Sequence, residues 1–307
     1  MHESLHRYNA IILGGGKSPL NDSEHHGMYK GNTQFCGRAL GSIVYEAVAK
    51  GHTFDRIALV MERDNELQIR ESQDVYSTPD PAMCRNFFRS LKFYASANSG
   101  NHSIDDGVAD NFVFAGDLPF LRAEHVKAFY DAVHLHHNVD VAIPIIPRGI
   151  NESAFPDRLR HYLRFKEGEY LIGNMAYLSQ NAMRENCGRL EKLYEGHDDK
   201  WSFLQKIVEQ VGLKTVLHLH PTGYKVFGIE AADIAEKFFR AMSIKEFEEH
   251  AAKFLHLGTN GNERAVKLIE LNHPEMAYDI DTAEDFREAE RLNKSMYNLE
   301  AIVKNSD

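Results

Sequence analysis

The sequence predicts an α/β protein with a doubly wound, three-layer αβα core and a mainly parallel sheet. Two observations carry this prediction. In the first half of the chain, short apolar runs that end in polar or glycine-containing turns alternate with helical patterns, which favours parallel strands joined by helices. The chain has 307 residues, which suffices for one large domain or for a domain with a sizeable insertion.

Composition narrows the classes of function. Hydrophobic residues make up 43% of the chain and charged residues 26%, as is ordinary for a soluble globular protein. A formal net charge of -10 argues against a broad nucleic-acid surface. No apolar run reaches the roughly 20 residues of a membrane helix, and the first residues lack the apolar region of a signal peptide. Three widely spaced cysteines form no disulfide framework. We therefore expect a cytoplasmic protein with no membrane insertion; its oligomeric state is not predicted.

The first expected element is a strand at residues 10–13 that runs directly into three glycines. Successive glycines leave no side chains over the backbone, so its amides can approach a phosphate closely, and Lys17 adds a positive charge. A plain tight turn explains the glycines equally well. Neither a Walker loop nor the dinucleotide fingerprint fits, because Pro19 stands where the third glycine of that fingerprint belongs.

The rest of the core follows from the same patterns. The polar, glycine-punctuated segment 19–35 is expected to form a loop over a ligand beside the glycines. We expect further strands at residues 56–61, 111–115 and 139–143, and helices at residues 37–50, 81–97 and 122–136.

After Pro147 the pattern changes to that of a substrate-side insertion. It is expected to contain a hairpin at residues 162–165 and 170–177, then helices at residues 179–194, 199–211, 231–241 and 243–256. Strands at 265–271 and 277–280 and a helix at 283–292 then complete the core. The predicted division is a nucleotide-binding core of residues 1–147 and 265–307, with an α+β insertion at residues 148–264.

A second motif, Gly116 to Leu121, follows the strand at 111–115. An aspartate at the carboxyl end of a parallel strand points into the crevice where such sheets bind ligands, and a hard carboxylate suits Mg²⁺. Asp117 is therefore a candidate metal ligand. A helix N-cap before Pro119 is the other interpretation.

A third motif is Tyr278 to Phe286. Asp279 and Asp281 alternate on an extended segment, so their side chains share one face. Two carboxylates on one face are costly unless they are hydrogen-bonded or bound to a metal. The alternative is that this stretch only caps a helix, through Thr282.

These three motifs, in this order, resemble those of the MobA-like (molybdenum-cofactor guanylyltransferase-like) NTP transferase family, which has the nucleotide-diphospho-sugar transferase (GT-A-like) fold. Residues 11–18 resemble its glycine-rich opening, although Leu20 stands where the family usually has an arginine. Residues 116–121 match its Asp-Met/Leu-Pro-Phe-Leu string. Residues 279–285 resemble its Asp/Asn-x-Asp/Asn-Thr-Pro-Glu-Asp string, with Ala283 in place of proline.

The resemblance implies a nucleotidyltransferase of EC 2.7.7 type. Such an enzyme moves a nucleoside monophosphate from an NTP to a phosphorylated or otherwise anionic acceptor, and releases pyrophosphate with the help of Mg²⁺.

The resemblance also implies roles for individual residues. Lys30, before a segment similar to the family's Gly-Lys-Pro-Leu helix start, falls near the position of the catalytic lysine, with Lys17 assisting. Asp117 and Asp281 are the expected Mg²⁺ ligands. The triphosphate is expected on Leu13, Gly14, Gly15, Gly16, Lys17 and Ser18. Gly173 and Asn174 resemble the family's acceptor-side Gly-Asn, and Asp279 is expected beside them. Arg164 and Lys166 are acceptor candidates on other grounds: they lie two apart on an expected strand and so share a face. A hairpin with a solvated basic face explains the two cations equally well.

Two other functions stay open at this point. A glycosyltransferase that uses a nucleotide-sugar is expected to carry an Asp-x-Asp string at the end of a central strand, which Gly116 to Pro119 lacks. A nucleotide-binding regulator without catalysis is favoured by Leu20 in the arginine position. Neither the acceptor nor the preferred base follows from the sequence.

Overall fold

The computed structural model describes residues 8–15, 17–20, 28–52, 54–63, 67, 69, 74–77, 110–136, 138–156, 158, 160, 162–180, 182, 242–255, 257 and 265–304. The helices expected at 81–97, 199–211 and 231–241 lie outside these residues, as does nearly all of the one expected at 179–194. Gly16 also lies outside them.

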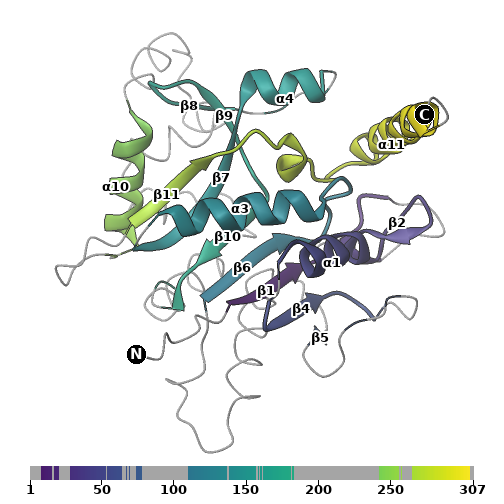
Figure 1. Ribbon diagram of the computed structural model, residues 1–307, viewed down its shortest axis with the longest axis horizontal. Coiled ribbons are helices and arrows are strands. Elements are labelled where there is room, and N and C mark those ends of the chain that lie inside the picture. The colour runs from purple at the N-terminus through teal and green to yellow at the C-terminus, as the bar shows by residue number, and fades with distance from the viewer. Residues whose placement is uncertain are drawn as a thin grey trace, which may run out of the picture.

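The described residues form a mixed α/β fold around a nine-stranded, mainly parallel sheet, as the sequence predicts (Figure 1). The strand order is β5-β4-β1-β6-β10-β7-β9-β8, and β11 pairs with β7. These strands are β1 (Tyr8–Leu13), β4 (Arg56–Val60), β5 (Val75–Ser77), β6 (Asp110–Ala115), β7 (Val139–Pro147), β8 (Leu163–Arg164), β9 (Glu169–Ile172), β10 (Met175–Leu178) and β11 (Ala265–Glu270). Strands β5, β4, β1 and β6 run parallel, as do β7 and β11, whereas β9 and β10 are antiparallel to β7.

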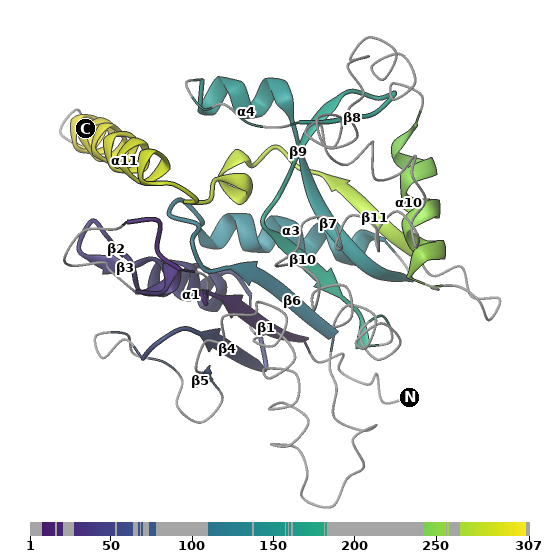
Figure 2. The ribbon, with the colours of Figure 1, turned by 180° about the vertical axis from the view of Figure 1, so that it is seen from behind.

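Helices cover both faces of this sheet. The helices are α1 (Leu40–Gly51), α3 (Ala123–Leu135), α4 (Arg148–Ala154), α10 (Ile244–Phe254) and α11 (Ala283–Lys304), with 3-10 helices η1 (Lys30–Asn32) and η3 (Pro274–Ala277). Helices α1 and α3 share a core with Ala142 and Ile146 of β7, whereas α10 packs near Ile145. Alternate residues of a strand point to opposite faces, so α10 lies on the other side of the sheet from α1 and α3. Figure 2 shows α1 and α3 behind the strands.

Two expected elements differ from those in the structure. Helix α1 begins at Leu40 because a short hairpin of β2 (Gln34–Phe35) and β3 (Arg38–Ala39) precedes it, turning at Cys36 and Gly37, which both have positive φ. The expected strand at 277–280 is wrong: Pro274 opens η3 there, and the chain beyond it joins no sheet. Strand β7 has no edge left for it, because β11 and the β9–β10 strand occupy both sides.

Strands β9 and β10 form one path along β7 that is interrupted at residues 173–174. Ala142 lies opposite Tyr177 and Ile145 opposite Ile172, so a step of three residues on β7 matches a step of five on its partner. The two extra residues form a bulge. Its backbone reaches two other segments: Asn174 accepts a hydrogen bond from Ala115 N–H (2.9 Å) and donates one to the Met276 carbonyl (2.8 Å). The bulge thus joins the end of β6 to η3.

The hairpin strands that the sequence places in the insertion are part of the central sheet. The division of the chain at residues 148 and 264 stays a prediction. Among the described helices, none has the length and apolar character that crossing a membrane requires.

Candidate active site

Three backbone segments meet where β1, β4 and β6 end. Gly14 N–H donates to the Val60 carbonyl at the end of β4 (3.0 Å), and Gly116 N–H donates to the Leu13 carbonyl (2.9 Å). Gly31, in η1, donates its N–H to the Gly14 carbonyl (2.9 Å). The glycine turn after β1 therefore lies between the Asp117 motif and the segment that carries Lys30.

Two of these three glycines, Gly14 and Gly116, are required by the space available. A Cβ on Gly116 would lie 2.7 Å from Gly14 Cα, and a Cβ on Gly14 would lie 2.8 Å from Gly31 Cα. Both distances are shorter than real side chains permit, and backbone atoms have little freedom to move away. The absence of side chains thus brings three main chains into direct contact at the carboxyl edge of the sheet.

The segment between the glycine turn and Lys30 is closed at its base. Lys17 and Tyr29 form an isolated antiparallel bridge, and Ser18 N–H donates to the Met28 carbonyl (2.8 Å). The buried hydroxyl of Thr33 lies 2.9 Å from Ser18 Oγ. We call these contacts the neck. The neck fixes the chain on both sides of the expected ligand loop, and Lys30 directly follows Tyr29.

The ammonium of Lys30 bonds two carboxylates from distant parts of the chain. Its Nζ lies 2.9 Å from Asp117 Oδ2 and 2.6 Å from Asp281 Oδ1. Asp117 follows β6 and its side chain is 9% exposed, whereas that of Asp281, before α11, is 53% exposed. The structure therefore brings together the three residues that the sequence analysis took for the catalytic lysine and the metal ligands.

Burial and charge act in opposite directions within this triad. Burial on its own lowers the pKa of Lys30, but the adjacent Asp117 and Asp281 outweigh it and raise the pKa, so the amine is a cation at neutral pH. Burial raises the pKa of Asp117, although Lys30 opposes this. Burial also tends to raise the pKa of the more exposed Asp281, but its hydrogen bond to Lys30 lowers it overall.

The donor set fits a magnesium ion. The two carboxylate oxygens bond the same nitrogen, so they lie close enough together for one cation to contact both. Mg²⁺ prefers one or two carboxylates and completes its octahedron with water and phosphate oxygens. Asp117 and Asp281 offer such a set beside the glycine turn, and we propose them as its ligands.

Asp279 pairs with two arginines. Tyr278 and Ile280 are buried, so the aspartates on either side of Ile280 share the opposite face, as the alternation predicts. Arg160 Nη2 lies 2.5 Å from Asp279 Oδ1, and Arg158 Nη2 bonds the Asp279 carbonyl. Burial raises the pKa of Asp279, and Arg160 opposes this.

Arg158 also anchors the beginning of α11. Its guanidinium lies over the Tyr278 ring, 3.6 Å from the centroid, and 3.2 Å from Asp285 Oδ1. Asp285 in turn accepts from the Thr282 N–H (2.9 Å) and hydroxyl (2.8 Å), and donates its own N–H to Thr282 Oγ1. The capping role foreseen for Thr282 is therefore present together with the carboxylate face. Asp281 therefore lies between two residues that are held in place, Asp279 by the arginines and Thr282 by Asp285.

We expect Asp279→Asn to destabilise the protein far more than Asp281→Asn. The Asp279 side chain is 17% exposed and faces two guanidinium groups, and removing one partner of a buried ion pair costs about 3 kcal/mol or more. Asp281 is largely exposed, and its loss leaves Lys30 with Asp117, so about 1 kcal/mol or less is expected. Urea denaturation without metal measures both. Equal losses would show that Asp279 has no anchoring role.

The other residues expected to bind the triphosphate lie around the glycine turn. Gly14 and Gly15 are buried at the carboxyl edge of the sheet, and Lys17 is exposed. Leu20, in the position of the family's arginine, packs against an apolar cluster that includes Phe35 and Tyr278. This position therefore contributes packing and no charge.

The residues expected to bind the acceptor fall into two groups. Gly173 and Asn174 form the bulge that touches the end of β6, just before Asp117. Arg164 and Lys166 instead pair with carboxylates on the surface, with Glu169 at 2.9 Å and Glu246 at 3.0 Å. Their role in acceptor binding stays a prediction.

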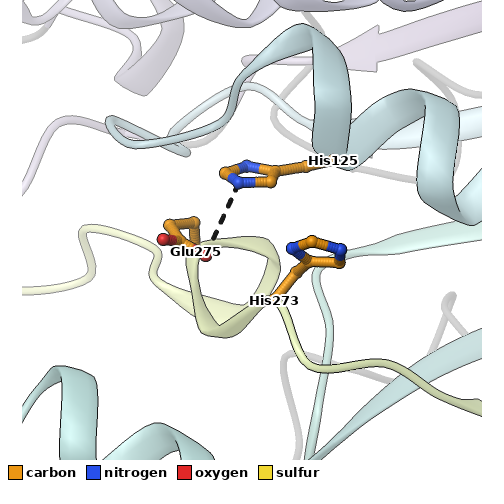
Figure 3. Close-up of side chains that lie close together, drawn as sticks. All are labelled: His125, His273 and Glu275. Atoms are coloured by element: carbon orange, nitrogen blue, oxygen red, sulfur yellow. Dashed lines mark ion pairs between the residues drawn. The ribbon is translucent and has the colours of Figure 1, made fainter.

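A group of His125, His273 and Glu275 has ligand atoms that all lie within 4.8 Å of one another (Figure 3). However, His125 Nδ1 accepts the Arg122 N–H (3.2 Å), so the neutral ring carries its proton on Nε2, which faces Glu275 Oε2 at 3.6 Å. A protonated nitrogen has no lone pair for a metal. We interpret the group as a polar contact that holds α3 against η3.

Arg158 and Arg160 were not foreseen from the sequence. Their spacing of two residues, equal to that of Asp279 and Asp281, was the signal that could have found them. The cations chosen instead, Arg164 and Lys166, have the same spacing a few residues further on.

Solved structures resemble this fold at low sequence identity. A hypothetical transferase from Thermus thermophilus aligns with a TM-score of 0.65 and 19% identity, over 91% of this chain and 99% of that one. A CMP:2-keto-3-deoxy-manno-octonic acid synthetase complexed with CTP aligns with a TM-score of 0.49 and 11% identity, over 95% of this chain and 99% of that one. The first likeness establishes the fold; the second is too distant to add to it.

Sequence comparison establishes the family. No curated protein sequence matches the chain. The model of the MobA-like NTP transferase domain matches residues 10–211, which is more than half of the chain and includes the glycine turn, Lys30 and Asp117. The chain belongs to the MobA-like NTP transferase family.

Proposed function

We propose that this protein is a Mg²⁺-dependent nucleotidyltransferase, which transfers a nucleoside monophosphate from an NTP to a small anionic acceptor and releases pyrophosphate. The observation that carries the proposal is the contact of Lys30 with both Asp117 and Asp281 beside the glycine turn. Family membership supports transfer from an NTP. The cytoplasm is the proposed location, since the sequence has no disulfide framework.

In this mechanism the chain positions the reactants and balances their charge. Phosphoryl chemistry depends mainly on positioning and on neutralising charge in the transition state. The amides around Gly14 and Gly15 hold the triphosphate, with Ser18 and Lys17 beside it. Lys30 stabilises the negative charge that grows on the α-phosphate and on the leaving pyrophosphate.

Asp117 and Asp281 would hold Mg²⁺ next to Lys30. The ion supplies Lewis-acid polarisation of phosphate oxygens. Both carboxylates also bond Lys30, so the lysine and the metal ligands would act side by side on the triphosphate. The ammonium of Lys30 is positioned beside the glycine turn, where it can bond a phosphate oxygen of the triphosphate.

The proposal is tested in two steps with the full chain. Thermal melts with each of the four nucleoside triphosphates and Mg²⁺ identify the base, because a ligand that binds only the folded state raises the melting temperature. The preferred NTP is then incubated with candidate sugar phosphates, alcohol phosphates and pterin phosphates, and pyrophosphate is measured. Pyrophosphate release that requires one acceptor supports the proposal.

Two results would contradict it, and they separate the alternatives. Binding of a nucleotide-sugar with release of a nucleoside diphosphate would identify a glycosyltransferase. NTP binding without turnover for any acceptor in the panel would favour the nucleotide-binding regulator, which Leu20 supports.

A further inference from the structure

Arg158 has hydrogen-bond donors that the protein leaves unused. Its side chain is 4% exposed, and Nη2 faces Asp279 and Asp285. Its Nε and Nη1 are buried and have no hydrogen-bond partner in the part of the chain that the structure describes. A buried polar group without a partner destabilises the fold, and a charged group does so more strongly, so such donors are rare and require an explanation.

Arg160 repeats this pattern closer to the surface. Its side chain is 18% exposed, and Nη2 bonds Asp279. Its Nε is also buried without a partner among the described residues. The two guanidinium groups therefore have the same arrangement: a carboxylate holds Nη2 in place, and other donors are left for an acceptor that the described residues do not supply.

The arginine pair adjoins the triad of Lys30 with its two aspartates. Asp279 contacts both arginines, and the charge of Arg160 also helps to lower the pKa of Asp281, which bonds Lys30. The unused donors thus lie one aspartate away from the proposed reaction centre. A group bound there is separate from the triphosphate but belongs to the same site.

We propose that Arg158 and Arg160 bind an oxyanion of the acceptor, a phosphate or a carboxylate, that takes no part in the bond formed. This inference rests on the proposed function and names the chemistry of its second substrate. Guanidinium groups match the planar carboxylate and the phosphate better than an ammonium does, because their donors are fixed in a fork. Asp279 and Asp285 orient the forks, and the ligand's oxygens satisfy the remaining donors.

Other cations in this part of the chain are less suited to the task. Arg164 and Lys166 are about half exposed, and each is already paired with a glutamate. Arg148 is similarly exposed and is held by Glu152 and Glu169. None of the three has a buried donor without a partner among the described residues.

The test uses inorganic phosphate, and separately acetate, as probes of the full chain without metal. Thermal melts and calorimetric titrations are made for the wild type, Arg160→Gln and Arg158→Gln. Arg148→Gln is the matched control, since it removes the same charge from an exposed guanidinium that two carboxylates hold. We expect phosphate to bind the wild type and Arg148→Gln equally, and Arg160→Gln at least tenfold more weakly. Stronger binding of acetate than of phosphate would identify a carboxylate acceptor.

Lys30→Ala separates this subsite from the triphosphate site. It should keep the phosphate response, because Lys30 does not contact the arginines. Phosphate binding that survives in Arg160→Gln but is lost in Lys30→Ala would place the anion at the glycine turn and overturn this inference, while leaving the transferase proposal intact. No phosphate or acetate binding by the wild type would also overturn it. Arg158 is almost fully buried, so Arg158→Gln can fail to fold. Arg160 is more exposed, so we expect Arg160→Gln to fold, and the test then rests on this variant.

Discussion

Lys30→Ala is expected to lower turnover by about 10²–10³-fold while changing the affinity for the NTP much less. The loss of one donor to charge that develops in the transition state has this magnitude. Such a donor acts on kcat more than on ground-state binding. Steady-state rates of pyrophosphate release and a direct titration with the NTP give the two constants.

A second measurement makes this prediction sharper. Lys30 occupies the carboxylates proposed for the metal, so its removal should increase the affinity for Mg²⁺ alone, although activity falls. Lys50→Ala is a suitable control, because its ammonium is exposed and pairs only on the surface, with Glu46 at 3.2 Å. If Lys30→Ala changes only the affinity for the NTP, Lys30 binds the NTP in the ground state and does not stabilise the transition state. Unchanged Mg²⁺ affinity would mean that lysine and metal do not share ligands.

Asp117→Asn should abolish Mg²⁺-dependent turnover with the fold retained. The amide has the same shape as the carboxylate, and Lys30 keeps Asp281 as a partner. A ligand present at 100 times its dissociation constant stabilises the folded state by about 2.7 kcal/mol, so a metal response is measurable in melts with Mg²⁺ and the NTP. This response should disappear in the variant.

Asp110→Asn is the control for this substitution. Asp110 begins β6 and accepts hydrogen bonds from the Tyr177 hydroxyl and the Gln180 N–H, whereas Asp117 follows the opposite end of the same strand. The control should keep both activity and the metal response. A normal response in Asp117→Asn would remove this residue from the metal site.

The central triad could be foreseen because two kinds of information agreed. Asp117 follows a strand whose apolar pattern is unambiguous, and carboxyl ends of parallel strands gather at one edge of a sheet. Lys30 lies in a polar loop that has no periodicity, so only its resemblance to the family's lysine pointed to it. The structure adds the physical reason for its place, which is the contact of Gly31 with Gly14.

What the sequence did not reveal depends on contacts between distant segments. Arg158 and Arg160 are more than 100 residues from Asp279, and nothing near them in the chain indicates that partner. The expected strand at 277–280 failed because alternation of buried and exposed residues also occurs in an extended chain without a strand partner. A strand at residues 277–280 would have needed a free edge of β7 to pair with. The sequence of residues 277–280 does not show that β9, β10 and β11 already occupy both edges.

The neck has a consequence for which changes in the chain leave Lys30 in place. The Lys17–Tyr29 bridge and the Ser18–Met28 hydrogen bond close the chain before Lys30, and the Gly31–Gly14 hydrogen bond secures the lysine on the other side. We therefore expect Lys30 to keep its position when the chain between Leu20 and Met28 is changed in length or sequence.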